Sequence, residues 1–312
     1  LVIGVGNEEH FIASDPSPFL KYTKRAIYLD DEEVVEISKN KLLIQTIDKK
    51  VKSPTIQKLT MELEEIEKGG FETFMLKEIY EQPKSIIDTL RGRIIKTKQE
   101  IKLRGFNEGK KKFSKAKRII ILGCGTSWIA GLVAEYIIEG LAKLPVEVEY
   151  ASEFRYRNPI IKENDVVLAI SQSGETADTL AALELAKDKG AIILGICNVV
   201  GSSIPRLTNA GSYTHAGPEI GVASTKAFTT QVVVLILMAL RIGKQKGVLS
   251  NTDYHQIITE LELIPQKIEQ VLETNNKIEI IAKQFKNANN FLYLGRGYNF
   301  PVALEGALKL KE

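Results

Sequence analysis

Cysteine, histidine and tryptophan are scarce in this sequence, and their scarcity excludes several kinds of site. The 312 residues contain two cysteines, three histidines and one tryptophan. Three scattered histidines are too few for a zinc centre. Cys124 and Cys197 lie in or beside apolar runs, which is typical of buried thiols and not of a disulfide framework. We therefore expect no metal site, and a reducing, cytoplasmic environment.

The chain also lacks an excess of one charge and a long hydrophobic run. Lys and Arg number 42 against 39 Asp and Glu, for a net charge of +3 with both signs interspersed. This balance indicates no nucleic-acid partner. The longest apolar run, 232–240, is too short to span a bilayer, and the first six residues carry no basic region of a signal peptide. We therefore expect no membrane partner.

Both ends of the sequence are abrupt. It begins without Met inside a strand-like segment and stops inside the helix-like segment 303–312. These features predict that the sequence is a segment of a longer protein.

The first 50 residues show the pattern of short β-strands, at 1–5, 25–29, 34–37 and 41–47. Residues 51–70 are polar and rich in Glu, which is typical of a linker or a surface helix. From Phe74 the pattern becomes helical. Pro83 predicts the start of a second helix, in which Ile86, Leu90 and Ile94 recur at helical spacing.

From residue 116 onward strands and helices alternate regularly. The predicted strands are 118–122, 146–151, 165–170, 191–196 and 212–215, and the predicted helices are 128–141, 179–189 and 227–242. This alternation predicts an α/β fold in which a doubly wound, five-stranded parallel sheet carries helices on both faces. Ligands of such sheets bind at the carboxyl ends of the strands.

The C-terminal region of the chain repeats the opening of this pattern. Residues 253–285 are helical, with a predicted interruption at Pro265. Residues 291–299 then match 119–127, with an apolar strand, a Gly-x-Gly turn and a helix. We therefore divide the chain into a β-rich region (residues 1–55), linking helices (56–105), one α/β domain (106–250) and the start of a second (251–312).

A turn rich in hydroxyl groups follows the strand 165–170. Ser171, Ser173, Thr176 and Thr179 lie where a strand ends and a helix begins. The first N–H groups of a helix lack partners and its dipole is positive there, so an anion fits. The alternative is simple helix capping, which needs one hydroxyl and not four.

Two other strand-end loops offer small residues and hydroxyls, at Thr126/Ser127 and at Ser224/Thr225. Three such loops at one sheet edge predict a phosphate cradle. Trp128 occupies the third glycine position of a dinucleotide fingerprint, and the glycine spacing at 221–226 does not complete a Walker loop, so neither nucleotide motif is present.

Further polar residues carry weaker signals. Glu305, Lys309 and Glu312 share one helical stripe. The stripe is either a surface salt-bridge ladder or a carboxylate with a neighbouring ammonium that moves a proton, and spacing alone does not decide between them. His215 and Trp128 are interpreted as loop or packing residues, and Cys124 as a small buried hydrophobe.

These residues together resemble a known family. The runs 123–127, 171–176 and 219–226 resemble the sugar isomerase (SIS) domain and, more narrowly, the isomerase half of the glutamine–fructose-6-phosphate aminotransferase family. Residues 77–83 and 303–312 fit the same family, and residues 1–15 are similar to the end of its glutaminase domain. The β-rich region, residues 1–55, is accordingly expected to be a remnant of that domain.

The resemblance implies a role for each matching residue. Ser127, Ser171, Gln172, Ser173 and Thr176 would hold the sugar phosphate, and Thr126, Val222 and Ser224 would line the sugar. Glu312 would transfer the proton between C1 and C2, Lys309 would assist it, and Glu305 would support both.

The resemblance also implies an activity. The family transfers ammonia from glutamine to fructose 6-phosphate, forming glucosamine 6-phosphate without a metal or organic cofactor, and its members are usually homodimers or larger. The cysteine nucleophile of the glutaminase and most of the second SIS domain have no match here. We therefore expect this polypeptide alone to bind sugar phosphate weakly and not to complete the reaction.

Two alternatives differ in class from this interpretation. One is a non-catalytic SIS module that senses a phosphosugar for a regulator. The other is a deglycase or simple phosphosugar isomerase without a glutaminase domain. The β segments of residues 1–50 argue against both.

Overall fold

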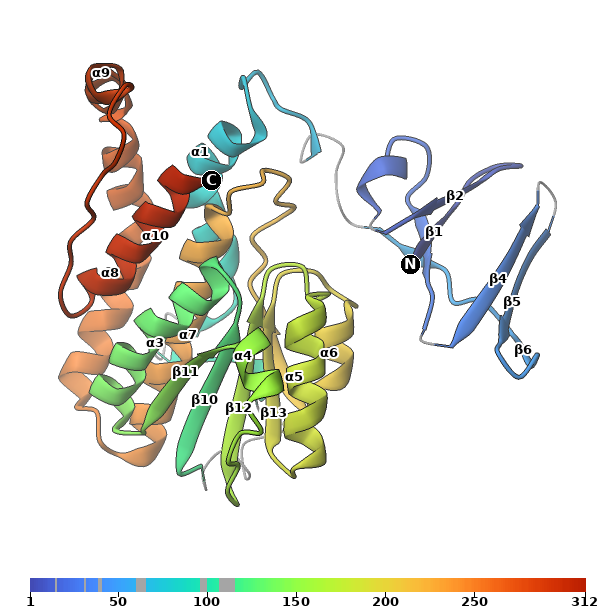
Figure 1. The fold of residues 1–312 in the computed structure, drawn as a ribbon, viewed down its shortest axis with the longest axis horizontal. Coiled ribbons are helices and arrows are strands. Elements are labelled where there is room, and N and C mark those ends of the chain that lie inside the picture. The colour runs from blue at the N-terminus through green and yellow to red at the C-terminus, as the bar shows by residue number, and fades with distance from the viewer. Residues whose placement is uncertain (15, 31, 39–40, 60–65, 96–99, 107–115) are drawn as a thin grey trace. The chain divides into compact units, whose positions relative to one another are not determined.

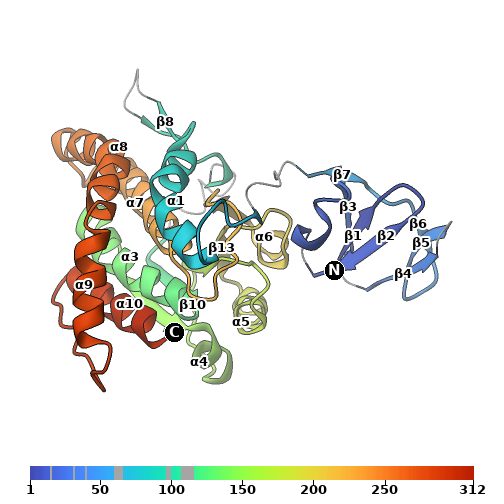
Figure 2. The same cartoon turned by 90° about the horizontal axis from the view of Figure 1, so that it is seen from above.

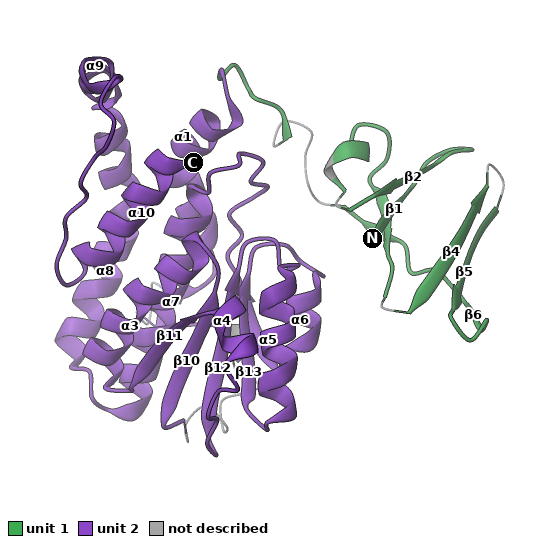
Figure 3. Ribbon diagram, viewed as in Figure 1, with its two compact units in different colours: residues 1–71 green, residues 72–312 purple. Residues whose placement is uncertain are grey.

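The computed structural model describes residues 1–14, 16–30, 32–38, 41–59, 66–95, 100–106 and 116–312. The chain forms two compact units, residues 1–71 and residues 72–312 (Figure 3). The acidic residues Glu62, Glu64 and Glu65, which fall in the predicted linker, lie outside the described residues.

The first unit consists of two antiparallel sheets. One has the order β2 (His10–Ala13), β1 (Val2–Val5), β3 (Arg25–Tyr28) and β7 (Gln57–Lys58), and the other pairs β4 (Glu33–Ser38), β5 (Lys41–Thr46) and β6 (Val51–Lys52). Ile3, Ile27 and Ile44 are buried together in its core. The four predicted strands are confirmed, whereas β2, β6 and β7 were not predicted.

The second unit is built on a parallel five-stranded sheet, which confirms the predicted fold class. Its order is β11 (Val146–Tyr150), β10 (Arg118–Gly123), β12 (Asp165–Ser171), β13 (Ile192–Cys197) and β14 (Ala210–Tyr213). The chain runs from β10 outward to β11, then returns to the other side of β10 to form β12. The order therefore reverses between β10 and β12, and a ligand site is expected at that point.

Helices cover both faces of this sheet (Figure 1). Side chains alternate along a strand, so Ile119 and Ile121 face α3 (Thr126–Ala142) and α7 (Lys226–Lys246). Ile120 and Leu122 face the other layer, which contains α4 (Ala151–Tyr156), α5 (Ala177–Asp188) and α6 (Ser203–Leu207). Every residue of β12 is buried, as a central strand covered on both faces requires.

The predicted helix break at Pro83 is wrong. A single helix, α1 (Phe74–Leu90), continues through the proline. Proline has no N–H to give to the carbonyl oxygen of Ile79, four residues earlier. The side-chain amide of Gln82 donates to that oxygen at 3.0 Å instead. The helix ends at Leu90, and Ile94 belongs to a hairpin of β8 (Ile94–Ile95) and β9 (Glu100–Ile101), not to a helix.

The C-terminal region also departs from two predictions. Helix α8 (Asn251–Leu272) continues through the buried Pro265 and packs against α1, and α9 (Asn275–Phe285) begins after a turn at Glu273 and Thr274. The predicted strand at 291–294 is irregular and exposed, because it pairs with no strand in the described part of the chain. Helix α10 (Asn299–Lys311) follows the glycine turn as predicted and lies against α3, as Figure 2 shows.

One helix is long and apolar enough to cross a membrane by length and composition alone. This is α7, and 72% of its apolar window is buried inside the second unit. It lies against α1 and α3. Such burial is typical of the core helix of a globular domain.

Candidate functional site

A cavity of about 260 Å³ lies at the carboxyl ends of β10 and β12, where the strand order reverses. Three loops and the end of α10 meet around it. Its lining residues are Cys124, Thr126, Ser127, Ile170, Ser171, Gln172, Ser173, Thr176, Val222, Ser224 and Glu312. All eight residues predicted to contact substrate therefore share one cavity with the predicted base, Glu312. Lys309 and Glu305 stand behind this lining.

The serine turn after β12 forms one wall of the cavity. The Ser171 hydroxyl accepts the Gly174 N–H at 2.9 Å and lies 3.3 Å from the Thr176 hydroxyl. Gly174 has φ +70°, and a Cβ there would approach the Ser202 hydroxyl to 2.0 Å, so glycine is required. The turn thereby places the hydroxyls of Ser171, Ser173 and Thr176 around one space, directly before α5.

The capping alternative for this turn is not what the structure contains. Thr176 is the N-cap of α5, yet its side chain makes no capping hydrogen bond within the described residues. Its hydroxyl instead lines the cavity. Thr179, counted in the sequence as a fourth hydroxyl of the turn, is wrongly assigned, because it is buried within α5 outside the cavity.

Glu175 lies in the same turn, and its carboxylate points away from the anion site. It accepts hydrogen bonds from the N–H and hydroxyl of Ser203 at 2.8 and 2.7 Å. These bonds fix the turn against α6. They also hold the negative charge of Glu175 away from the hydroxyls of the serine turn, where that charge would repel an anion.

The loop after β10 supplies Thr126 and Ser127, at the beginning of α3. Gly125 precedes them with φ +53° and offers no capping side chain, and the Ser127 N–H donates to the Cys124 carbonyl at 3.2 Å. The Ser127 hydroxyl accepts a hydrogen bond from the side-chain amide of Gln231 at 3.1 Å. Because the Ser127 oxygen is the acceptor in this bond, the hydroxyl can still donate its own proton to another group. Sequence reasoning missed Gln231, whose signal is a buried amide on the otherwise apolar helix α7.

The third loop contributes Val222 and Ser224. Its internal shape is set by Glu219, which accepts from the Ser224 hydroxyl at 2.9 Å and from the N–H groups of Thr225 and Ala227 at 2.8 and 3.1 Å. Glu219 therefore supplies the cap that begins α7. Its role was not predicted from the sequence.

The helical stripe on α10 faces the cavity region and is not an open surface ladder. The ammonium of Lys309 is 2.6 Å from the Glu312 carboxylate and 3.5 Å from that of Glu305. Thr126 joins the group, donating to Glu305 at 2.9 Å and accepting from Lys309 at 3.3 Å. Glu305 is buried, and this burial raises the pKa of its carboxyl despite the hydrogen bond from Thr126. Of these three residues, Glu312 is the one that lines the cavity.

The structure also places the other residues that the sequence singled out, which are two aromatic residues and the two cysteines. Trp128 stacks on Tyr150 with ring centroids 4.1 Å apart, which confirms a packing role. His215 lies in a loop at φ +57°, and burial lowers the pKa of its imidazole. Cys197 is buried as predicted, whereas Cys124 is partly exposed and lines the cavity, so its assignment as a buried hydrophobe is wrong.

The cavity suits an anion held by neutral donors. Its lining, within the described part of the chain, includes no Lys or Arg side chain, and Glu312 is its charged residue. Hydroxyls at the beginnings of α3 and α5 supply neutral donors. No group of three or more potential metal ligands occurs among the described residues.

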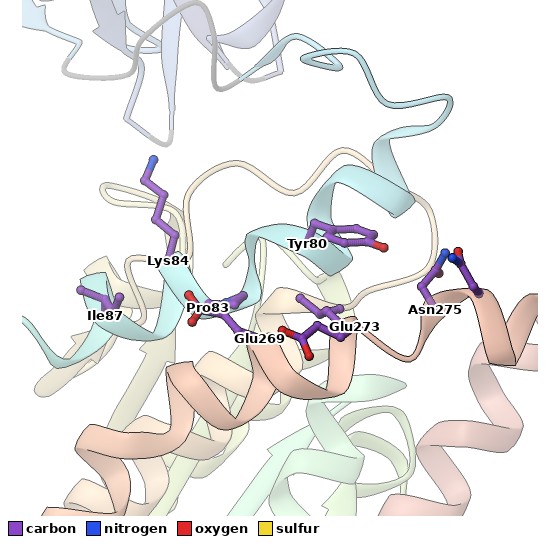
Figure 4. Close-up of a pocket in the computed structure, with 9 residues that line it drawn as sticks. Tyr80, Pro83, Lys84, Ile87, Glu269, Glu273 and Asn275 are labelled. Carbon is purple, nitrogen blue, oxygen red and sulfur yellow. The ribbon is translucent and has the colours of Figure 1, made fainter.

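A larger hollow of about 610 Å³ lies elsewhere, between α1, α8 and α9 (Figure 4). Its charged lining consists of Lys84, Glu269 and Glu273, so carboxylates outnumber ammonium groups. This hollow offers no Ser or Thr hydroxyl among the described residues of its lining and does not lie at the carboxyl ends of the parallel strands, so we assign the site to the smaller cavity.

Comparisons with known proteins agree with this architecture. The sequence model of the SIS domain matches residues 112–241, so the class defined by the fold and the strand-end cavity is that of SIS-domain proteins. Curated proteins named glutamine–fructose-6-phosphate aminotransferase (isomerizing) match the whole chain. Those of Bacteroides thetaiotaomicron and Chlorobaculum tepidum are each 54% identical, and the chain covers 51% of each.

A solved structure gives the same result. The C-terminal domain of glucosamine-fructose-6-phosphate aminotransferase from Francisella tularensis is 43% identical, with a TM-score of 0.76 over 79% of this chain and 68% of that one. The chain belongs to the glutamine–fructose-6-phosphate aminotransferase family, and it spans about half the length of the curated relatives that it matches.

Proposed function

We propose that the second unit binds a hexose 6-phosphate and is the isomerase portion of an enzyme that makes glucosamine 6-phosphate from fructose 6-phosphate and glutamine-derived ammonia. The observation that carries this proposal is the shared cavity, in which a hydroxyl-rich turn and the carboxylate of Glu312 face the same space. The names of the relatives support the choice of substrates.

The phosphate would bind at the serine turn and the start of α3. Ser127, Ser171, Gln172, Ser173 and Thr176 line that part of the cavity, and the N-terminal amides of α5, which begins directly after Thr176, would add donors. Neutral donors bind a dianion without the strong ion pairs that would slow its release. Thr126, Val222 and Ser224 would then contact the sugar.

Proton transfer is the chemistry proposed for Glu312. Ammonia and the C2 carbonyl of the ketose form an imine with loss of water. Glu312 removes a proton from C1 and returns one to C2, while the C1 hydroxyl loses a proton and the imine nitrogen gains one, so the imino alcohol becomes an amino aldehyde. The two are isomers, so this step needs only proton transfer and no oxidant, metal or organic cofactor. Lys309, 2.6 Å from Glu312, orients the carboxylate, and Glu305 supports Lys309.

A catalytic role is favoured over a sensing module because of this carboxylate and its ammonium partner. Binding a phosphosugar requires the hydroxyl turn alone, whereas the Lys309–Glu312 pair at the cavity adds a proton-transfer group.

We further propose a cytoplasmic location, consistent with the free thiols of Cys124 and Cys197, and a homodimer, as the family resemblance implies. The domain boundaries at 55, 105 and 250 likewise remain proposals.

Calorimetric titration tests the binding proposal. Glucosamine 6-phosphate should bind, while glucosamine, which lacks the phosphate, should bind far more weakly. Ser171→Ala should weaken the phosphosugar by about tenfold, as expected when one hydrogen bond to a charged group is lost. Equal affinity for the two sugars, or a crystal soaked with the phosphosugar in which the cavity stays empty, would contradict the proposal.

A further inference from the structure

One side of α1 is both polar and buried, although none of its residues lines the cavity. Glu78, Ser85 and Thr89 are 2%, 5% and 0% exposed. A buried polar group costs free energy unless it is hydrogen-bonded. The partners of this stripe therefore indicate its role. Besides a hydrogen bond from Thr89 to the Ser85 carbonyl within α1, at 2.7 Å, the partners of these side chains among the described residues lie in one segment, residues 213–226.

The contacts run along the two segments in opposite order. The Arg93 guanidinium, just beyond α1, donates to the Tyr213 carbonyl. Thr89 donates to the Thr214 carbonyl at 2.7 Å, and Ser85 donates to the Ala216 carbonyl at 3.1 Å. Glu78 and Glu81 make the contacts nearest the cavity. The segment that leads from β14 to α7 is thus fastened to α1 along its length.

Glu78 bonds to two successive backbone amides of this segment. Its carboxylate accepts the N–H groups of Ile220 and Gly221 at 2.6 and 3.0 Å. A Cβ on Gly221 would lie 2.6 Å from the same carboxylate, so the close approach needs glycine. Burial raises the pKa of Glu78, and the two amide hydrogen bonds oppose that shift. The two backbone N–H groups offset part of the free-energy cost of burying this carboxylate, and the charge of Lys226 also lowers its pKa.

A second charged contact lies one turn further along α1. The Glu81 carboxylate is 2.6 Å from the ammonium of Lys226, the first residue of α7, and Lys226 is 2% exposed. Lys77 also reaches Glu81, at 3.5 Å. The loop 219–225 is therefore anchored to α1 on both sides of its tip.

The tip of this loop carries the residues that line the cavity, Val222 and Ser224. Val222 is 97% exposed, so packing does not hold it in place. Glu219 fixes the shape of the loop internally, whereas Glu78 fixes where the loop lies relative to the rest of the unit.

We propose that Glu78 is a positioning residue for substrate: from α1 it holds the loop 219–225 so that Val222 and Ser224 meet the sugar, without itself touching the ligand. The proposal rests on the proposed function of the cavity. The loop 219–225 would recognise the sugar, whereas the loops after β10 and β12 would hold the phosphate. Loss of Glu78 should therefore weaken recognition of the sugar and leave recognition of phosphate intact.

The test compares Glu78→Ala and Glu78→Gln with Lys84→Ala, a control on the exposed side of the same helix. Glucosamine 6-phosphate and inorganic phosphate are titrated into the 312-residue chain, with backbone amide resonances as the readout. Glu78→Ala should weaken the phosphosugar by about tenfold and inorganic phosphate by less than about twofold. Glu78→Gln keeps the size and one acceptor oxygen, so its loss should be intermediate, and Lys84→Ala should match the wild type.

An equal loss for both ligands in Glu78→Gln, or no loss for the phosphosugar in Glu78→Ala, would overturn the positioning role. Hydrogen exchange separates this outcome from a failure of the proposed function. If the wild type binds neither ligand, the cavity assignment fails. In that case the exchange of the Ile220 and Gly221 amides still decides the positioning role, since it should accelerate by about tenfold in Glu78→Ala, and unchanged exchange would refute it.

Discussion

The hydroxyl of Thr126 donates a hydrogen bond of 2.9 Å to the carboxylate of Glu305, which lies 179 residues further along the chain. This bond links the first turn of α3 to α10. It ties the wall of the cavity to the helix that carries Lys309 and Glu312, so the candidate site is assembled from distant segments.

Replacing this hydroxyl should therefore loosen α10. Thr126→Val keeps the shape of the side chain but removes the closer of the two donors to the buried Glu305 carboxylate, the other being Lys309 at 3.5 Å. We expect a loss of about 1–3 kcal/mol in the free energy of unfolding, measured with urea. Thr126→Ser retains the hydroxyl and should lose less than half of that amount. If the valine and serine variants are equally stable, the bond contributes nothing.

The carboxyl of Glu305 should also make stability depend on pH. Its pKa is raised by burial, so the folded state binds a proton more tightly than the unfolded state. A raised pKa contributes stability that is present at pH values below the unfolded-state pKa of about 4.5 and is lost as the pH rises through the folded-state pKa. Lys309 and Glu312 face the same carboxyl and act in opposite directions, Lys309 lowering the pKa and Glu312 raising it.

Urea unfolding of the wild type and of Glu305→Gln, at pH values below and above about 4.5, provides the measurement. The variant should lose less stability than the wild type as the pH rises above about 4.5, since the amide does not ionise. Parallel curves for the two proteins would show that Glu305 does not carry this dependence.

The serine turn should tolerate no side chain at Gly174. Gly174→Ala places a Cβ 2.0 Å from the Ser202 hydroxyl in a left-handed conformation, with a cost of roughly 2–4 kcal/mol. Gly190→Ala is the matched control, because Gly190 also has a positive φ, of +84°, but no described atom lies within 4 Å of an added Cβ. It should cost only about 1 kcal/mol. Thermal unfolding measures both, and similar losses would mean that the contact with Ser202 is relieved by movement.

The two thiols should differ in reactivity. Burial raises the pKa of Cys197 to about 12, so its thiolate is scarce at neutral pH. Cys124 is partly exposed in the cavity. A thiol reagent at mildly alkaline pH should modify Cys124 in the folded protein and leave Cys197 unmodified, and glucosamine 6-phosphate should slow the reaction. Peptide mass spectrometry identifies the site, and modification of Cys197 first would contradict the assigned burial.

Local patterns were sufficient for the sheet and for most of the cavity lining. The apolar runs of β10, β12 and β13 are buried on both faces, so their sequences alone indicate central strands. Hydroxyl-bearing turns follow directly after β10 and β12, and parallel strands bring those turns to one edge. The same local reasoning failed at Pro83 and at 291–294. The first was decided by the side chain of Gln82, and the second by the absence of a pairing strand in the described part of the chain.

The sequence by itself determined the α/β fold, the serine turn and the membership of the family, because each depends on the order and spacing of neighbouring residues. Only the tertiary structure decided which distant side chains support that turn and the loops beside it. Gln231, Glu78 and Glu305 reach the cavity loops from separate helices. A buried polar residue signals that a partner exists, but the partner is chosen by packing between segments that lie far apart in the chain.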